Sequence, residues 1–346
     1  GTNTYTGATT ISAGTLAITN AAGLGTTAVG TTVNSGAVLD LRAVTVGAEA
    51  ITLNGGTIAT SIGTSSLSGA VTLSANSTVN VSSGAVLTIS GIINGPSYTL
   101  YNSGAGTFTA SNGSNSYATN TTLTGTVTLT ASGYGGVTDT LIINSGVTLD
   151  LAGFTLTNAI ILNGGTITNS STTASTLSGA ISLTAASTIN AANAMTLSGI
   201  ISGSGALTKT GTGTLTLSGT NTYTGATTIS EGALTVSGTL ANTTAITVAS
   251  IAAYNVNSTD TVGSIAGAGS IAIGSGFTLS TGGDNTSTSF SGVLSGSGSL
   301  TKIGTGTTTL SAANTYTGAT TVSGGILSVS SLASGGSSSN IGASAN

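Results

Sequence analysis

The 346-residue sequence contains no histidine, no cysteine, no tryptophan and a single proline, Pro96. Zinc, haem and iron–sulfur sites depend on cysteine or histidine ligands, so these absences exclude them. They also exclude a disulfide-stapled scaffold and a Ser-His-Asp catalytic triad. We therefore expect this chain to bind no metal and no cofactor.

Charge is equally scarce, because three basic and seven acidic side chains give a net charge of −4. A nucleic-acid-binding protein needs a basic surface, which this composition cannot supply. Disorder is disfavoured as well, since 38% of the residues are hydrophobic and the net charge is small. No apolar run is long enough for a membrane-spanning helix. The composition indicates a folded, nearly uncharged chain rich in glycine and hydroxyl residues.

Internal repeats are the strongest pattern in the sequence. The segment NTYTGATTIS occurs unchanged at Asn3–Ser12 and Asn221–Ser230, and with one substitution at Asn314–Ser323. A more divergent copy occupies Asn115–Leu123, and the intervals between the tyrosines of the four copies shorten along the chain. The other repeated elements are SGIING at Ser90, SGIISGSG at Ser198, SGVLSGSG at Ser291, NSGAVLDL at Asn34, NSGVTLDL at Asn144, and LNGGTI at Leu53 and Leu162.

A finer period of about 20 residues lies within these long repeats. The LNGGTI element at Leu53 is followed one such step later by an apolar triplet at Leu73, and its copy at Leu162 is followed by one at Leu183. Each step holds short alternating runs rich in β-branched residues and separated by Gly, Ser and Asn, which is typical of β-strands. Good helix formers such as Glu, Lys and Met are nearly absent.

This spacing predicts an all-β fold, a single parallel β-helix (β-solenoid) with about 20–22 residues per coil and roughly 16 stacked coils. A β-sandwich is the alternative, but its core normally holds more aromatic residues than the 3% present here. We expect one continuous solenoid over residues 1–346, repeat units anchored near Tyr5, Tyr117, Tyr223 and Tyr316, an irregular region at 97–136 and a low-complexity end at 334–346.

Two long segments, Gly203–Val236 and Gly296–Val329, share the order Leu-Thr-Lys, Gly-Thr-Gly-Thr and Asn-Thr-Tyr-Thr-Gly. This order resembles the autotransporter-associated β-strand repeat, also called the passenger-associated transport repeat. Gly1–Ile18 is similar to the second half of another copy, and Tyr98–Leu129 to a diverged one. The resemblance implies a right-handed β-helix and a passenger of a Gram-negative type V secretion system, exported across the outer membrane.

Clustered carboxylates are what a polysaccharide-processing β-helix would need. Asp40 and Asp150 occupy equivalent Leu-Asp-Leu positions, but about five coils of strand spacing separate them, too far for a catalytic pair. Asp40, Arg42 and Glu49 form a local cluster, for which we expect a solvated coil edge with a weak ion pair. The acidic residues are Asp40, Glu49, Asp139, Asp150, Glu231, Asp260 and Asp284.

The two lysines, Lys209 and Lys302, share the same Leu-Thr-Lys position of the repeat. A Ser–Lys dyad is conceivable at either, but a residue repeated in a ladder is more often structural. We therefore predict that the chain is not an enzyme and has no catalytic residue.

Tyrosines fall into two groups. Tyr5, Tyr223 and Tyr316 recur at one repeat position, which predicts a coil-packing ring with a hydroxyl that bonds to a backbone group. The aromatic residues of region 97–136 are denser, and they form our hypothesis for a ligand face: Tyr98, Tyr101, Phe108, Tyr117 and Tyr134.

Our leading hypothesis for function is a rigid fibre or stalk segment of an extracellular bacterial surface or secreted protein. An adhesin with a glycan-binding face is the alternative, and a polysaccharide-processing enzyme is the third hypothesis. Gly1 begins in mid-repeat, and neither end offers a polar cap or a helix. We expect the partners to be further copies or a continuation of the same chain, with surface glycans as possible ligands and no nucleic acid.

Overall fold

The computed structural model of the protein describes residues 1–112, 114–117, 121–123, 126–128, 140–332, 334 and 336–343. Strands of two to five residues alternate with turns, and no helix occurs among these residues. In the described part, accordingly, no helix is long and apolar enough to cross a membrane. The chain divides into two compact units, residues 1–168 and residues 169–346.

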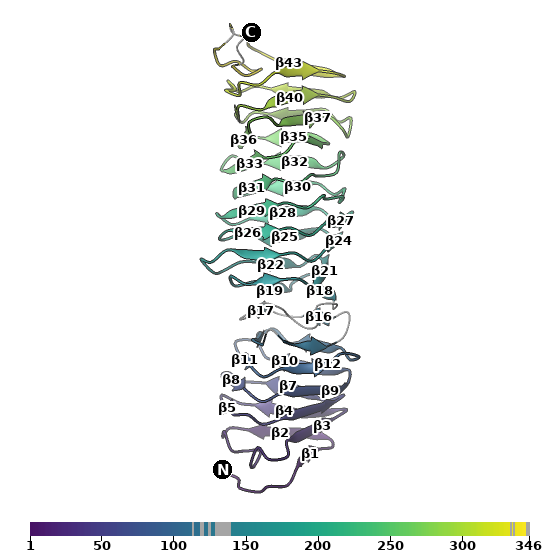
Figure 1. The fold of residues 1–346 in the computed structure, drawn as a ribbon, viewed down its shortest axis with the longest axis vertical. Coiled ribbons are helices and arrows are strands. Elements are labelled where there is room, and N and C mark those ends of the chain that lie inside the picture. Colours follow the sequence, from purple (N-terminus) through teal and green to yellow (C-terminus); the bar gives the residue numbers. More distant parts are fainter. Residues whose placement is uncertain are drawn as a thin grey trace. The chain divides into compact units, whose positions relative to one another are not determined.

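The strands of the first unit stack as parallel sheets, one strand of each sheet per coil (Figure 1). Its strands, grouped by sheet, are β1 (Thr9–Ile11), β3 (Thr31–Asn34), β6 (Ile51–Asn54), β9 (Val71–Ala75), β12 (Ile93–Gly95) and β15 (Ser116–Tyr117); β2 (Gly14–Ile18), β4 (Ala37–Leu41), β7 (Thr57–Thr60), β10 (Ser77–Val81) and β13 (Leu100–Ser103); β5 (Thr45–Val46), β8 (Thr64–Leu67), β11 (Val86–Ile89), β14 (Thr107–Ala110), β17 (Thr126–Thr128), β19 (Thr148–Asp150) and β22 (Thr166–Thr168); and β16 (Thr121–Leu123), β18 (Thr140–Asn144) and β21 (Ala159–Asn163), with β20 (Thr155–Leu156) following β19 in the chain.

The second unit repeats this arrangement. Its strands, again grouped by sheet, are β23 (Ser175–Leu177), β26 (Met195–Leu197), β29 (Thr214–Leu217), β31 (Gly232–Val236), β33 (Ala252–Val256), β36 (Ser270–Ile273) and β39 (Leu294–Gly296); β24 (Ile181–Ala185) and β27 (Ile201–Gly203); β25 (Ser187–Asn190), β28 (Leu207–Thr210), β30 (Thr227–Ile229), β32 (Ala245–Val248), β35 (Ser264–Gly267), β38 (Thr288–Phe290), β41 (Thr307–Leu310) and β43 (Ile326–Val329); and β34 (Asp260–Val262), β37 (Thr278–Thr281), β40 (Ser299–Lys302) and β42 (Thr320–Val322).

The length of a coil follows from the residues that pair on neighbouring strands. Asn34 pairs with Asn54 on the next coil, and most other pairs have nearly the same separation in sequence. The coil is shorter between Tyr254 and its partner Ile271, and longer between Leu16 and its partner Leu39. The all-β parallel solenoid predicted from the sequence is therefore confirmed. The prediction that one continuous solenoid spans residues 1–346 stays a prediction.

Apolar ladders fill the interior of the coils. In the second unit, Leu215, Leu234, Tyr254, Ile271 and Leu294 stand in successive paired positions, and all are fully buried. The side chains that alternate with them point outward, as strand geometry requires. One outward ladder consists of hydroxyl residues on four successive coils, Thr176, Thr196, Thr216 and Thr235.

The repeated asparagine of NTYTG fastens three coils together where the chain leaves regular strand geometry. The Asn221 side chain is buried, and its Oδ1 accepts a hydrogen bond at 3.0 Å from the Ile201 N–H of the preceding coil. Its Nδ2 donates to the carbonyl oxygens of Gly219 and Thr239 at 2.9 and 3.0 Å. Asn314 accepts from the Leu294 N–H in the same way, at 2.8 Å.

In the two full copies, the glycine of NTYTG lies against the last glycine of the SGSG element one coil earlier. A Cβ atom at Gly225 would lie 2.1 Å from the Gly205 carbonyl oxygen, and one at Gly318 would lie 2.2 Å from that of Gly298. Side chains cannot approach a backbone so closely. Glycine is therefore required at Gly225 and Gly318 because the backbones of successive coils meet there.

The C-terminal segment differs from the expectation that no cap covers this end. Ser339 and Asn340 are buried, and the Asn340 carbonyl oxygen accepts a hydrogen bond from Asn314 Nδ2 at 2.7 Å. The Ala343 N–H donates to the Tyr316 carbonyl oxygen at 2.8 Å. Residues 336–343 thus lie against the NTYTG corner and cover part of the coil, a role that their Ser- and Gly-rich sequence did not indicate.

We expect Asn221→Ala to lower the free energy of unfolding by about 2–3 kcal/mol, because the buried Ile201 N–H loses its acceptor and two carbonyls lose a donor. Denaturant unfolding followed by circular dichroism measures this effect. The control is Asn255→Ala, since Asn255 Nδ2 donates to Thr235 Oγ1 at a half-buried outward position. Equal losses in the two variants would contradict the role of Asn221.

Candidate functional site

The cluster of Asp40 and Arg42 is an ion pair, but its carboxylate is not solvated. Asp40 is buried, and its Oδ2 lies 2.7 Å from the half-exposed Arg42 Nε. The Ser61 N–H and hydroxyl donate to the same carboxylate at 3.0 and 2.7 Å. Burial alone would raise the pKa of Asp40, but the hydrogen bonds and the positive charge of Arg42 outweigh it and lower that pKa. The expected solvated edge is therefore wrong for Asp40.

Glu49 does not join this pair. It is buried, and its Oε1 accepts a hydrogen bond from the Thr31 hydroxyl at 2.7 Å. Its Oε2 has no hydrogen-bond partner among the residues that the structure describes. The local sequence cluster is thus divided between two different environments, and within the described ranges no three acidic residues gather as a metal site would require.

Both lysines lie inside the solenoid with their ammonium groups held by backbone carbonyls. Lys209 is fully buried in a ladder between Ile189 and Ile229. Its Nζ donates to the carbonyl oxygens of Thr210, Gly211 and Glu231 at 2.8, 2.6 and 3.1 Å. Burial lowers the pKa of Lys209 to about 8, and the negative charge of Glu231 partly offsets this.

Lys302 repeats the arrangement of Lys209. It is fully buried, and its Nζ donates to the carbonyl oxygens of Ile303, Gly304 and Gly324. Burial lowers its pKa as well. An ammonium group enclosed by three carbonyls is not positioned to activate a serine, so this geometry supports a structural role for both lysines.

Asp260 is a buried acid whose hydrogen bonds come from the backbone. It stands in a ladder with Leu279 and Leu300, and its carboxylate accepts from the N–H groups of Leu240 and Thr261 at 3.0 and 2.9 Å. In the bond to Leu240, a side-chain oxygen accepts from an N–H group of the preceding coil, as the NTYTG asparagines do. Burial raises the pKa of Asp260 to about 6, although both backbone hydrogen bonds lower it.

The repeated tyrosines differ in burial but share one hydrogen bond. Tyr223 and Tyr316 are fully buried, whereas Tyr5 is 43% exposed. In each case the hydroxyl lies 2.5–2.6 Å from the hydroxyl of the threonine four residues later in the sequence. The bonded partner is a side chain, so the expected backbone partner is wrong, whereas Tyr223 and Tyr316 do pack inside the coils.

The aromatic residues of region 97–136 do not share one face. Phe108 and Tyr117 are buried in the interior, so their rings are not accessible to a ligand. Tyr98 and Tyr101 are exposed, at 36% and 42%. Tyr134, like the acid Asp139, lies outside the described residues. Of the proposed ligand residues that the structure describes, Tyr98 lines a groove.

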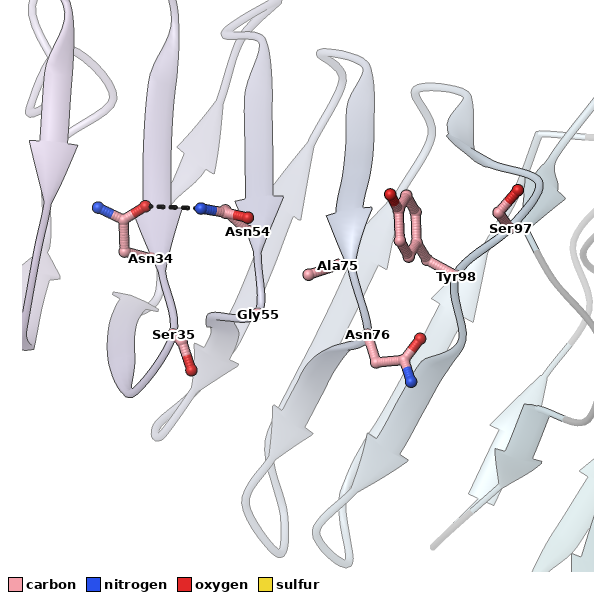
Figure 2. Close-up of a pocket in the computed structure, with 8 residues that line it drawn as sticks. All are labelled: Asn34, Ser35, Asn54, Gly55, Ala75, Asn76, Ser97 and Tyr98. Atoms are coloured by element: carbon pink, nitrogen blue, oxygen red, sulfur yellow. Dashed lines mark hydrogen bonds between the residues drawn. The ribbon is translucent and has the colours of Figure 1, made fainter.

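This groove is an open hollow of about 800 Å³ on the first unit, to which each of four successive coils contributes two neighbouring corner residues (Figure 2). Asn54 Nδ2 donates to Asn34 Oδ1 at 3.2 Å, and the Tyr98 ring stands farther along the same row, beyond Ala75. Its lining residues are all uncharged: Asn34, Ser35, Asn54, Gly55, Ala75, Asn76, Ser97 and Tyr98.

Tyr98 is presented by a rigid turn. The Tyr98 N–H donates to the Gly95 carbonyl oxygen at 2.9 Å, and Pro96 fills the second position of this turn. Asn76 Oδ1 accepts from the Thr99 N–H at 2.9 Å and so fastens the turn to the preceding coil. The single proline of the chain therefore fixes the backbone that carries the exposed ring.

The sequence contains a partial signal for this groove, because Asn34 opens the NSGAVLDL motif and Asn54 lies in LNGGTI. Asn34, Asn54, Asn76 and Tyr98 follow one another at nearly equal intervals, each close to the length of one coil. The row does not follow a single ladder of paired residues, because the register shifts after Leu53 and Asn54 pairs with Ala75.

A comparison with protein families gives three matches to the Passenger-associated-transport-repeat, at residues 1–18, 207–236 and 300–329. These ranges confirm the resemblance found in the sequence, while the diverged copy at Tyr98–Leu129 is not matched. The last two ranges begin at the strands that carry the buried lysines. Searches of curated proteins and of solved structures give no match.

Asp260 predicts a dependence of stability on pH. Its pKa is raised in the folded state, so the folded protein binds a proton more tightly than the unfolded chain. The stability that this group contributes is then greatest below about pH 4 and falls by about 1–2 kcal/mol as the pH rises through about 6. This range allows for the reduction of the effect by solvent screening. Asp260→Asn should abolish this slope in denaturant unfolding measured from about pH 4 to pH 7.

Asp284→Asn is the matched control for this slope. Burial raises the pKa of Asp284, but hydrogen bonds from Thr286 and Ser264 outweigh it and lower that pKa. Its contribution to stability is therefore lost below about pH 4, so this variant should keep the wild-type slope between about pH 4 and pH 6. A wild-type slope that survives Asp260→Asn would contradict the prediction.

Proposed function

We propose that this chain, which carries three matches to the passenger-associated transport repeat within a β-solenoid, is a structural segment of a passenger that a bacterium exports to its surface or secretes. The observation that carries the proposal is the use of the repeat residues. The lysine and asparagine of the two full copies are buried, and they bond to backbone groups of their own and neighbouring coils. The repeat therefore holds coils together.

A catalytic role receives no comparable support. The carboxylates of Asp40, Asp260 and Asp284 are each occupied by hydrogen bonds from neighbouring residues. The two lysines donate to carbonyl oxygens. These charged groups thus hold the backbone in place, which suits a rigid fibre or stalk segment. The proposal includes association of neighbouring copies, because three basic and seven acidic side chains provide little electrostatic repulsion between solenoids.

Antibody labelling of cells that produce the parent protein tests this proposal. We expect antibodies raised against the folded chain to label intact, unpermeabilised cells or to capture the protein from the medium. An antibody against a cytoplasmic protein should give signal only after permeabilisation, which controls for lysis. If the antibodies against this chain also required permeabilisation and found nothing in the medium, the protein would not be a surface or secreted passenger.

A further inference from the structure

We propose that the groove of Asn34, Asn54, Asn76 and Tyr98 binds an extended, neutral oligosaccharide of pyranose units. This goes beyond the structural role, because a spacer needs no ligand. The groove combines an exposed aromatic ring with a row of side-chain amides, and its lining contains no charged residue. Ligand sites commonly pair apolar or aromatic surface with a few convergent polar groups.

The ring of Tyr98 supplies the apolar surface. A pyranose presents a face of C–H groups that packs on an aromatic ring, and Tyr98 is 36% exposed at the edge of the hollow. The Gly95–Tyr98 turn and the Asn76 bond hold the backbone of this residue before any ligand arrives. Such preorganisation reduces the entropy lost on binding.

Amides on three of the four coils, Asn34, Asn54 and Asn76, supply the polar surface. The Oδ1 atoms of Asn54 and Asn76 already accept hydrogen bonds from the Ser74 hydroxyl and the Thr99 N–H. Asn34 Oδ1 is bonded to Asn54, which leaves Asn34 Nδ2 without a hydrogen-bond partner in the described part of the chain. Neutral amides donate to and accept from hydroxyl groups without a preference for charge. Successive coils are about 4.8 Å apart, close to the advance of an extended pyranose chain per ring, so each sugar can meet the corner of one coil.

The uncharged lining of the groove favours neutral over charged oligosaccharides. A uronic acid chain carries one carboxylate per ring and would need cationic partners, yet none of the lining residues is basic. An uncharged chain loses no ionic hydration in this groove. The ligand class that fits is therefore a neutral, extended chain such as a β-linked glucan or an N-acetylglucosamine oligomer.

Titration of the full chain with cellotetraose and with tetra-N-acetylchitotetraose, followed by saturation-transfer NMR and calorimetry, tests the proposal. We expect at least one of these neutral probes to bind and tetragalacturonate to bind more weakly. Tyr98→Ala should weaken binding by about tenfold, the effect of losing one aromatic stacking contact. Tyr98→Phe should retain binding, because it keeps the ring.

Tyr101→Ala is the matched control, since Tyr101 is similarly exposed, lies close by in the sequence and does not line the groove. It should bind the probe as the wild type does, and circular dichroism should show all three variants folded. The proposal is overturned if neither neutral probe binds the wild-type chain. Unchanged binding in Tyr98→Ala, or equally tight binding of tetragalacturonate, would overturn it as well.

Discussion

Stacking of successive coils is the constraint on which the other features depend. Within a sheet, a strand residue lies about 4.8 Å from its partners on adjacent coils, and most of these partners occupy the same position of the coil. A side chain is therefore tolerated at a position only if it packs against the side chains at the same position on the adjacent coils. Apolar residues meet this condition inside, as in the ladder from Leu215 to Leu294, and threonines meet it outside, as in the ladder from Thr176 to Thr235.

The same constraint explains how polar groups enter the interior. Charges at the same ladder position on adjacent coils would repel, so Lys209 stands between isoleucines and Asp260 stands next to a leucine. Each then bonds to backbone groups, because the turns leave N–H and carbonyl groups without strand partners. An amide, an ammonium and a carboxylate group thus have the same structural role in Asn221, Lys209 and Asp260. Each bonds to the backbone where regular strand pairing ends.

The fold could be predicted because the step of one coil is visible in the sequence and strands of this composition have few alternatives. The structural role of the lysines could be predicted from their shared repeat position. Burial of Asp40 and the alignment of Tyr98 with Asn34 and Asn54 could not, since both depend on which corners coincide. Coils of unequal length and the shift after Leu53 change that alignment without any local signal. Exposure of Tyr98 and burial of Phe108 likewise depend on the coils around them.

Deletion of one whole coil tests the central claim, that the solenoid is held together by coil-to-coil register, most directly. Removing residues 199–218 joins Ser198 to Gly219. This junction keeps the coil register, because the Ser218 N–H pairs with the Leu197 carbonyl one coil earlier. This whole-coil deletion should leave a folded β-solenoid with a cooperative unfolding transition and a circular dichroism spectrum of wild-type form. Removing only residues 199–208 moves apolar positions out of their ladders and should abolish that transition. If both deletions gave the same result, the account would be contradicted.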